Sequence, residues 1–246
     1  MKILHKMFSL QWLFTTLLVI AGAGICVRLG IWQLDRLEQR RAFNAQVASM
    51  RASEPLDLNT TLPEEIDTME WRAVTVTGEY DFANQMALRN QYNDGMYGFH
   101  LITPLLFDGG AVLVNRGWIP AESDSQPADW RVYDEPGVVT VAGQIRLGQG
   151  KPAFGGVADA LPADGKPLWV WNNLDVRMIS SQMPYPILDV FIQPNAGEDT
   201  EPPIPYQPVI ELTEGPHFGY ALQWFAFAAI LFLGYPFYLR KQDMTR

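Results

Sequence analysis

Apolar residues gather at the two ends of this 246-residue chain. From Phe218 to Leu239 there are 22 residues without a charge. At ~1.5 Å per residue, a helix of that length spans about 33 Å, which is enough to cross a bilayer. A second apolar run lies between Trp12 and Trp32, and tryptophan is enriched where a membrane meets water. The pattern predicts two transmembrane helices, one near each end of the chain.

The first apolar run has an alternative interpretation as a cleaved signal peptide, because Lys2, His5 and Lys6 give it a basic start. A secretory apolar core is usually only ~7–15 residues long, whereas this run continues to Trp32. We therefore predict a retained anchor. Helical spacing continues beyond it, with no proline or glycine from residue 31 to 52.

From Trp71 the pattern changes from helical to alternating: Val74 and Val76 lie on one face of the run 72–77 and Thr75 on the other, which is typical of a strand with one buried face. Turn sequences rich in glycine, asparagine and aspartate separate the alternating runs. Asp175 has the position of a helix cap. The pattern predicts strands at 72–77, 86–91, 97–105, 111–118, 138–146, 168–172 and 187–193. Short strands with little helix between them predict a mainly-β domain, an antiparallel sheet, sandwich or small barrel with some α structure.

Basic residues indicate how the two helices are oriented. Between Met178 and Leu239 there is no lysine or arginine, and Arg240 and Lys241 follow directly. Basic residues favour the cytoplasmic side, so both termini are expected there. The predicted segments are a cytoplasmic N-terminus (1–11), a transmembrane helix (12–32), a juxtamembrane helix (33–52), a periplasmic mainly-β domain (53–216), a second transmembrane helix (217–239) and a cytoplasmic tail (240–246).

Charge and cysteine content exclude several functions. Residues 42–217 contain 9 of the 18 basic and 24 of the 27 acidic residues, a net charge of −15. Such a domain is a poor partner for nucleic acid or anionic lipid. Cys26 is the only cysteine and lies in the first apolar run, so a disulfide, a thiol redox pair and a thiolate copper site in the exported domain are excluded.

The best-defined local motif is the strand end at Asn115, Arg116, Gly117 and Trp118. Glycine there allows a close backbone approach or an unusual dihedral angle. One interpretation is a structural lock in which Arg116 pairs with an acidic residue; the other presents its guanidinium to a carboxylate-bearing ligand. Motifs typical of serine hydrolases, phosphate loops and zinc proteases are absent from the sequence, and we expect no enzymatic activity.

His217 opens the second apolar helix, and Tyr220 and Trp224 follow it at helical spacing. Ala221 and Ala228 share that face. These residues are either an interfacial belt at headgroup depth or a ligand site with a ring nitrogen, an aromatic wall and small side chains.

Five segments resemble, in order and topology, the surfeit-locus (surfeit-one) family of cytochrome c oxidase assembly factors. The segments are Leu29-Gly-Ile-Trp-Gln-Leu-Asp-Arg36, Thr75-Val-Thr-Gly-Glu-Tyr80, Gly98-Phe-His-Leu-Ile-Thr-Pro104, Leu113-Val-Asn-Arg-Gly-Trp118 and His217-Phe-Gly-Tyr-Ala-Leu-Gln-Trp-Phe225. The resemblance covers almost the whole chain. The sequence departs from the family pattern at Glu214-Gly-Pro216, where relatives often carry asparagines.

The resemblance implies assembly of a haem–copper oxidase, with help in inserting haem a into the catalytic subunit. It implies haem binding at His217, and Trp32, Gly78, Asn115, Gly117 and Trp118 lie at motif positions. As further haem contacts we predict Tyr220 and Trp224, which share the helix face of His217, and Arg116, whose guanidinium suits a carboxylate-bearing ligand. The implied partners are the oxidase catalytic subunit, the lipid bilayer and, as a further candidate, haem a synthase. Only six residues precede Met7 and none is arginine, which favours a bacterial inner membrane over a mitochondrial one.

Two functional hypotheses stay open from the sequence. The first is a non-enzymatic carrier of haem a. The second is a membrane-tethered scaffold that stabilises the nascent oxidase subunit without binding haem, because the same aromatic face suits packing against another helix.

Overall fold

The computed structural model describes residues 2–121, 127–150, 152, 155–197, 201–206 and 208–244. The chain divides into two compact units, Met1–Gln46 with Glu211–Arg246 (the helical unit) and Val47–Ile210 (the barrel unit). Met1, Thr245 and Arg246, which belong to the predicted cytoplasmic ends, lie outside the described residues.

The helical unit contains α1 (Lys2–Met7), most of α2 (Leu10–Ala52) and α4 (His217–Met244). The helices α2 and α4 are both long and apolar enough to cross a membrane. The single helix α2 takes in the span expected at 12–32 and the juxtamembrane helix expected at 33–52. It extends far beyond a bilayer thickness because no helix breaker follows Gly30 until the helix ends.

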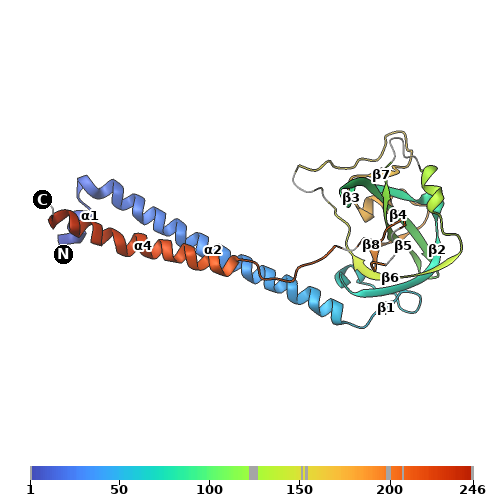
Figure 1. The fold of residues 1–246 in the computed structure, drawn as a ribbon, viewed down its shortest axis with the longest axis horizontal. Coiled ribbons are helices and arrows are strands. Elements are labelled where there is room, and N and C mark those ends of the chain that lie inside the picture. The colour runs from blue at the N-terminus through green and yellow to red at the C-terminus, as the bar shows by residue number, and fades with distance from the viewer. Residues whose placement is uncertain are drawn as a thin grey trace. The chain divides into compact units, whose positions relative to one another are not determined.

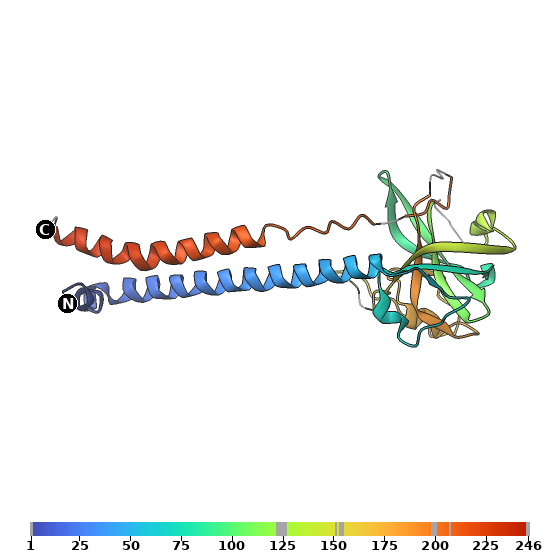
Figure 2. The same ribbon diagram turned by 90° about the horizontal axis from the view of Figure 1, so that it is seen from below.

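The helices α2 and α4 run antiparallel and side by side (Figure 1; Figure 2). Thr16 near the start of α2 hydrogen-bonds to Tyr235 near the end of α4, at 2.7 Å between the two hydroxyl oxygens. The less exposed residues on each helix recur at spacings of three or four, the pattern of a coiled-coil seam. On α2 they are Thr16, Val19, Ala23, Cys26, Gly30, Gln33 and Leu37, and on α4 they are His217, Ala221, Trp224, Ala228, Leu231, Tyr235 and Leu239.

Small side chains allow the two helices to approach closely. Gly30 is the tightest of the described glycine positions on α2, because a Cβ added there would lie 2.6 Å from the Phe225 ring. Gly24, on the same helix, has open space instead. Gly30 therefore fixes the helix contact, and Gly24 does not.

The barrel unit holds an eight-stranded sheet (Figure 1). The strands are β1 (Leu56–Asp57), β2 (Ala73–Tyr80), β3 (Met86–Asn93), β4 (Met96–Phe107), β5 (Gly110–Pro120), β6 (Val138–Arg146), β7 (Val170–Trp171) and β8 (Ile187–Pro194). Five of them close into a ring in the order β2-β6-β8-β5-β4, because β2 also pairs with β4. The barrel expectation is thereby confirmed. The sheet is mixed rather than antiparallel throughout, since β1–β2, β3–β7 and β5–β8 are parallel.

Gly78 lies where the ring closes. Next to it, Glu79 and Tyr80 of β2 pair with Leu106 and Leu105 of β4. A Cβ added to Gly78 would lie 2.1 Å from the carbonyl oxygen of Leu106, so any side chain there would force the strands apart. The motif position singled out in the sequence is a requirement of the barrel.

One part of the barrel interior is an apolar cluster, and the free Cys26 lies outside the barrel in α2. Leu105, Val112, Val114, Ile145 and Ile192 are fully buried together at its centre. A second cluster packs beneath the short helix α3 (Val176–Ser180). The predicted cap is confirmed, since the Asp175 side chain accepts a hydrogen bond from the Met178 backbone.

The predicted strands correspond to β2 through β8. The sequence pattern missed β1, which has two residues, and the 3₁₀ helices at Phe82–Asn84 and Asp129–Tyr133. The 3₁₀ helix at Ile66–Met69 lies in the acidic segment 53–70, where the sequence allows a short helix. Elements this short contain too few residues to show a period.

Candidate functional site

The chain enters α4 through a short turn that the local sequence dictates. Gly215 has φ +68°, a left-handed conformation in which glycine is not strained. Pro216 follows and accepts the hydrogen bond from the Tyr220 backbone at 3.1 Å, so the first turn of the helix forms directly after it. His217 is the first residue of the helix.

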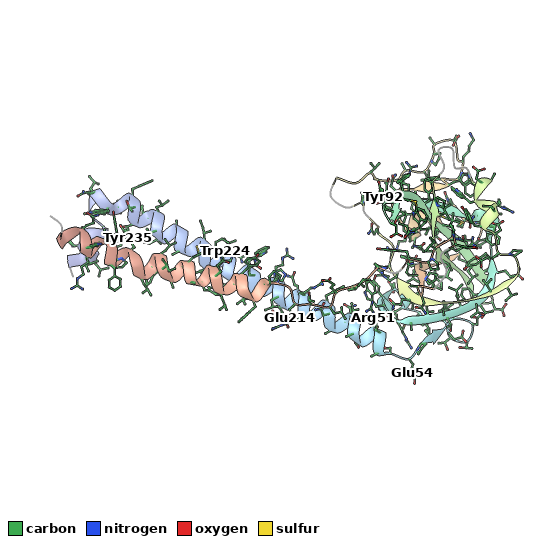
Figure 3. The ribbon with its side chains drawn as sticks, viewed as in Figure 1. Arg51, Glu54, Tyr92, Glu214, Trp224 and Tyr235 are labelled. Atoms are coloured by element: carbon green, nitrogen blue, oxygen red, sulfur yellow. The ribbon has the colours of Figure 1, made fainter. Side chains whose placement is uncertain are left out.

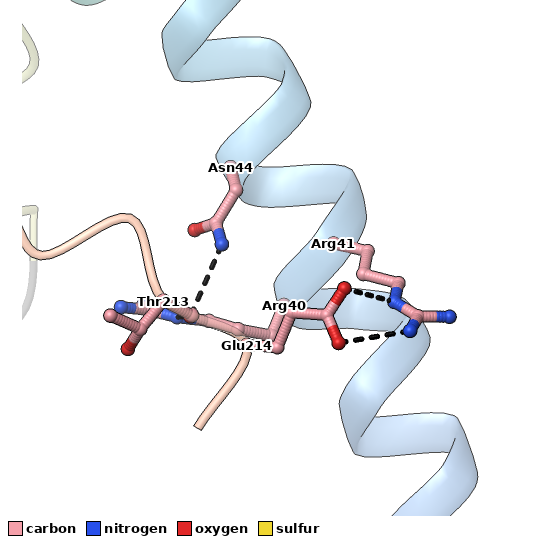
Figure 4. A network of polar contacts seen from close by, with 5 residues as sticks. All are labelled: Arg40, Arg41, Asn44, Thr213 and Glu214. Atoms are coloured by element: carbon pink, nitrogen blue, oxygen red, sulfur yellow. Dashed lines mark hydrogen bonds and ion pairs between the residues drawn. The ribbon is translucent and has the colours of Figure 1, made fainter. Parts of the chain in front are cut away.

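Side chains of α2 hold the segment before this turn (Figure 4). Arg40 donates to the carbonyl oxygens of Glu211 and Thr213, at 2.6 and 3.0 Å. Arg41 forms a two-point ion pair with Glu214, at 2.6 and 2.9 Å. The hydrogen bond from Arg41 lowers the pKa of Glu214. The departure from the family pattern at Glu214 thus has a physical partner on α2, and the start of α4 is anchored to that helix.

His217 lies against α2 through a single polar contact. Its Nδ1 is 2.8 Å from Oε1 of Gln33. An amide oxygen only accepts, so the imidazole donates from Nδ1; in the neutral ring the lone pair then lies on Nε2. Among the described residues no hydrogen bond to Nε2 occurs, and a Cβ on Gly215 would lie 3.7 Å from it. Glycine at position 215 therefore places no side chain beside this nitrogen.

The other predicted residues on the His217 face of α4 are either buried against α2 or partly exposed. Ala221 and Ala228 are buried, and serve the helix contact. Trp224 is half-buried with its ring against Phe227 at 5.9 Å between centroids, and it lies further along α4 (Figure 3). Tyr220 is 49% exposed. His217 and Tyr220 thus stay accessible near the helix start, whereas the alanines expected to admit a ligand face α2.

Trp32 lies on α2 next to Gln33 and is 41% exposed. The Arg36 guanidinium lies over its ring, 5.5 Å from the centroid. Gln33 itself was missed as a site residue, although it falls inside the first of the five quoted motifs. The spacing of three and four residues along α2 would have placed it on the seam.

Arg116 lies in the barrel unit with its side chain only 2% exposed. It donates to Gln85 at 3.0 Å, to Glu135 at 2.7 Å and to the backbone oxygen of Tyr133. The rings of Tyr80 and Phe82 flank the guanidinium, 5.0 and 5.2 Å away. Burial raises the pKa of Tyr80 to about 12, and Arg116 acts against that shift. These contacts are those of a structural lock.

Asn115 belongs to a second buried polar network. Its side-chain amide donates to Nδ1 of His100 at 3.2 Å and to Oε1 of Gln193 at 3.1 Å. Its Oδ1 accepts from the Gly117 backbone. The His100 ring packs on Tyr206, 5.4 Å between centroids, and burial lowers the pKa of His100 to about 4. His100 is therefore neutral near pH 7, and its contacts with Asn115 and Tyr206 stabilise the fold.

Gly117 and Trp118 connect this network to the segment at Ile204. Gly117 has φ +124°, and a Cβ on it would lie 2.2 Å from the carbonyl oxygen of Ile204. Trp118 exchanges two backbone hydrogen bonds with Ile204, both at 2.8 Å. Both properties expected of Gly117, the unusual dihedral angle and the close approach, are confirmed.

Within the described residues no group of three or more histidine, cysteine, aspartate or glutamate side chains is placed to hold a metal ion. A metal bound there by protein side chains alone is not indicated. A metal held mainly by its own macrocycle needs only one or two axial ligands.

Comparison with known proteins places most of the chain in one family. A model of the SURF1 family matches residues 20–229. An uncharacterized SURF1-like protein of Mycobacterium tuberculosis is 28% identical over 243 residues, covering 96% of this chain and 86% of the relative. SURF1-like proteins of Monosiga brevicollis and Rickettsia felis are 29% and 25% identical, covering 87% and 92% of this chain and 83% and 97% of the relatives.

Proposed function

This chain belongs to the SURF1 family, and we propose that it is an assembly factor for a haem–copper (cytochrome c) oxidase that binds haem a and helps insert it into the catalytic subunit. Residues 20–229, which match the family model, include most of α2, the barrel unit and the start of α4. The site we assign to haem a is the start of α4.

The contact between His217 and Gln33 carries the proposal. It positions a partly exposed imidazole so that Nδ1 donates to the amide oxygen, which in the neutral ring leaves the lone pair of Nε2 for an axial bond to haem iron. Bound haem a supplies an iron that takes an axial nitrogen, together with an apolar tail and anionic propionates. His217 would bind the iron, while Tyr220 and Trp224 would offer aromatic surface beside it. Arg116 has its own partners in the barrel, and we give it no role in haem contact.

We propose that the protein is anchored in a bacterial inner membrane by α2 and α4, with both termini cytoplasmic and the barrel unit periplasmic. Two apolar helices support an anchored protein. The absence of basic residues between Met178 and Leu239, followed by Arg240 and Lys241, supports the orientation. His217 would then lie near the periplasmic surface of the bilayer.

We propose a carrier rather than an enzyme. The chain's own part is to bind haem a, orient it through His217 and release it to the oxidase catalytic subunit. Haem a synthase is a candidate source. The bilayer is the medium in which the two helices and the apolar tail of the haem lie together.

The scaffold hypothesis remains the second candidate, because the outward face of α4 is also suited to another helix. Phe218, Leu222 and Ile230 are each more than half exposed in the single chain. Packing of that face against a nascent oxidase subunit needs no haem.

The oxidase made by cells that lack this gene distinguishes the two candidates. If the protein is a haem carrier, the catalytic subunit accumulates but contains less haem a per polypeptide, by spectroscopy and immunoblotting of the same membranes. If the subunit disappears while the remaining molecules keep a full haem complement, the carrier proposal is wrong and the scaffold is favoured.

A further inference from the structure

We propose that Gln33 is a positioning residue for His217, one that fixes which ring nitrogen faces an incoming ligand. This inference rests on the proposed function for its purpose. The contact itself is a property of the chain without ligand: Oε1 of Gln33 lies 2.8 Å from Nδ1 of His217.

Two fixed points hold Gln33 and His217 together. On one side, Gly30 lies three residues before Gln33 and brings α2 against the Phe225 ring. On the other side, Arg40 lies seven residues after Gln33, two helical turns away, and grips the segment at 211–213. The pair therefore lies between the close helix contact at Gly30 and the hydrogen bonds of Arg40. These two contacts keep the side chains of Gln33 and His217 near each other.

The chemistry of the pair selects one tautomer. A neutral imidazole carries one proton, on either nitrogen. The amide oxygen accepts a hydrogen bond, so the proton stays on Nδ1 and the lone pair stays on Nε2. Histidines that bind metals generally donate a hydrogen bond from the nitrogen opposite the metal. That bond orients the ring and makes the metal-binding nitrogen more basic.

The simpler interpretation is that Gln33 only holds the helices together, as polar residues in a coiled-coil seam do. The same seam supplies a matched control. Thr16 and Tyr235 form a buried polar pair between α2 and α4, 2.7 Å apart, at the opposite end of the helices. Tyr235→Phe removes that interhelical hydrogen bond without touching His217.

The first experiment uses haem-free full-length protein in detergent, labelled with ¹⁵N-histidine. The His217 signals are those missing from His217→Ala protein. We expect Nδ1 protonated and Nε2 unprotonated in the parent and in Tyr235→Phe, and a mixture of both tautomers in Gln33→Leu. A Gln33→Leu spectrum identical to that of the parent contradicts the inference.

The second experiment measures haem a binding and the reduction potential of the bound haem. Gln33→Leu should raise the dissociation constant about 10–100-fold, the usual effect of losing such a partner. Gln33→Glu should bind as the parent does but with a lower reduction potential, because a carboxylate makes the imidazole a stronger donor. Tyr235→Phe should change neither quantity.

Outcomes separate the inference from the function on which it rests. If the parent binds haem a and Gln33→Leu matches it in affinity and potential, Gln33 is not a positioning residue although the function stands. If the parent binds no haem a, the proposed function fails, and the ¹⁵N spectra still decide whether Gln33 sets the tautomer.

Discussion

Single side chains in this molecule are fixed by partners far away in the sequence. Asn115 meets Gln193, 78 residues later, and Arg116 meets Glu135. The sequence identified the turn at 115–118 as a motif and left Arg116 open between lock and ligand contact. Local spacing shows that Arg116 lies at the end of a strand. It does not show that the rings of Tyr80 and Phe82 and the carboxylate of Glu135 surround the guanidinium, because those residues come from other parts of the chain. The contacts that Arg116 makes within the chain are those expected of the lock.

His100 makes the barrel sensitive to acid. Burial lowers its pKa from 6.5 to about 4, so the folded state resists protonation that the unfolded state accepts. Its contribution to stability is complete above pH 6.5 and is lost as the pH falls from about 6.5 to about 4. The difference in pKa corresponds to about 3 kcal/mol.

The test compares the parent with His100→Gln, whose amide oxygen can accept from Asn115 as Nδ1 does. Urea unfolding followed by tryptophan fluorescence should show a parent whose free energy of unfolding falls more steeply with acid, by about 3 kcal/mol between pH 7 and pH 4. Parallel pH profiles for the two proteins contradict the assignment of His100.

At the scale of helices and strands, the sequence predicted where the longer strands lie but not which strands pair with one another. Strands β2 and β6 alternate between buried and more exposed residues, whereas β4, β5 and β8 are nearly continuous buried runs that turn sequences delimit. The pairing of β2 with β4, which closes the barrel, rests on strand order and on the bare backbone at Gly78. A glycine such as Gly78 indicates that another group lies close to the backbone, but the sequence does not identify that group.

The contact between α2 and α4 depends on Gly30. A side chain there would push against the Phe225 ring, whereas the same side chain at Gly24 enters open space. Gly30→Leu should lower the midpoint of thermal unfolding in detergent, at a cost of about 1–3 kcal/mol, the usual range for overpacking. Gly24→Leu, the matched control on the same helix, should be unchanged or slightly stabilised, because leucine favours helix more than glycine does. Equal effects of the two substitutions would rule out Gly30 as the point of contact.

At the scale of the whole molecule, the barrel unit has its own core and closes on itself. Residues 45–212, which contain it, should therefore fold alone and unfold cooperatively without any cofactor. The fragment lacks His217, so it should bind no haem a. A tight haem complex of this fragment would transfer the site to the barrel and overturn the assignment at α4.

The proposed topology can be tested on intact cells without outer membrane. The acidic loop between the helices should be cut by protease added outside, while tags at both termini stay protected. Digestion of either tag would contradict the arrangement that we infer from Arg240 and Lys241.

The central claim is that His217 holds haem a, and haem content of the purified full-length protein tests it most directly. From cells that make haem a, the parent should carry haem with the spectrum of a histidine-ligated iron, and His5→Ala, the control in α1, should match it. His217→Ala should lose at least tenfold in haem content while α4 still inserts. His217→Gln should lose it too, because an amide supplies a polar group but not a ring nitrogen. A His217→Ala protein with the haem a content and spectrum of the parent would contradict the account and favour the scaffold.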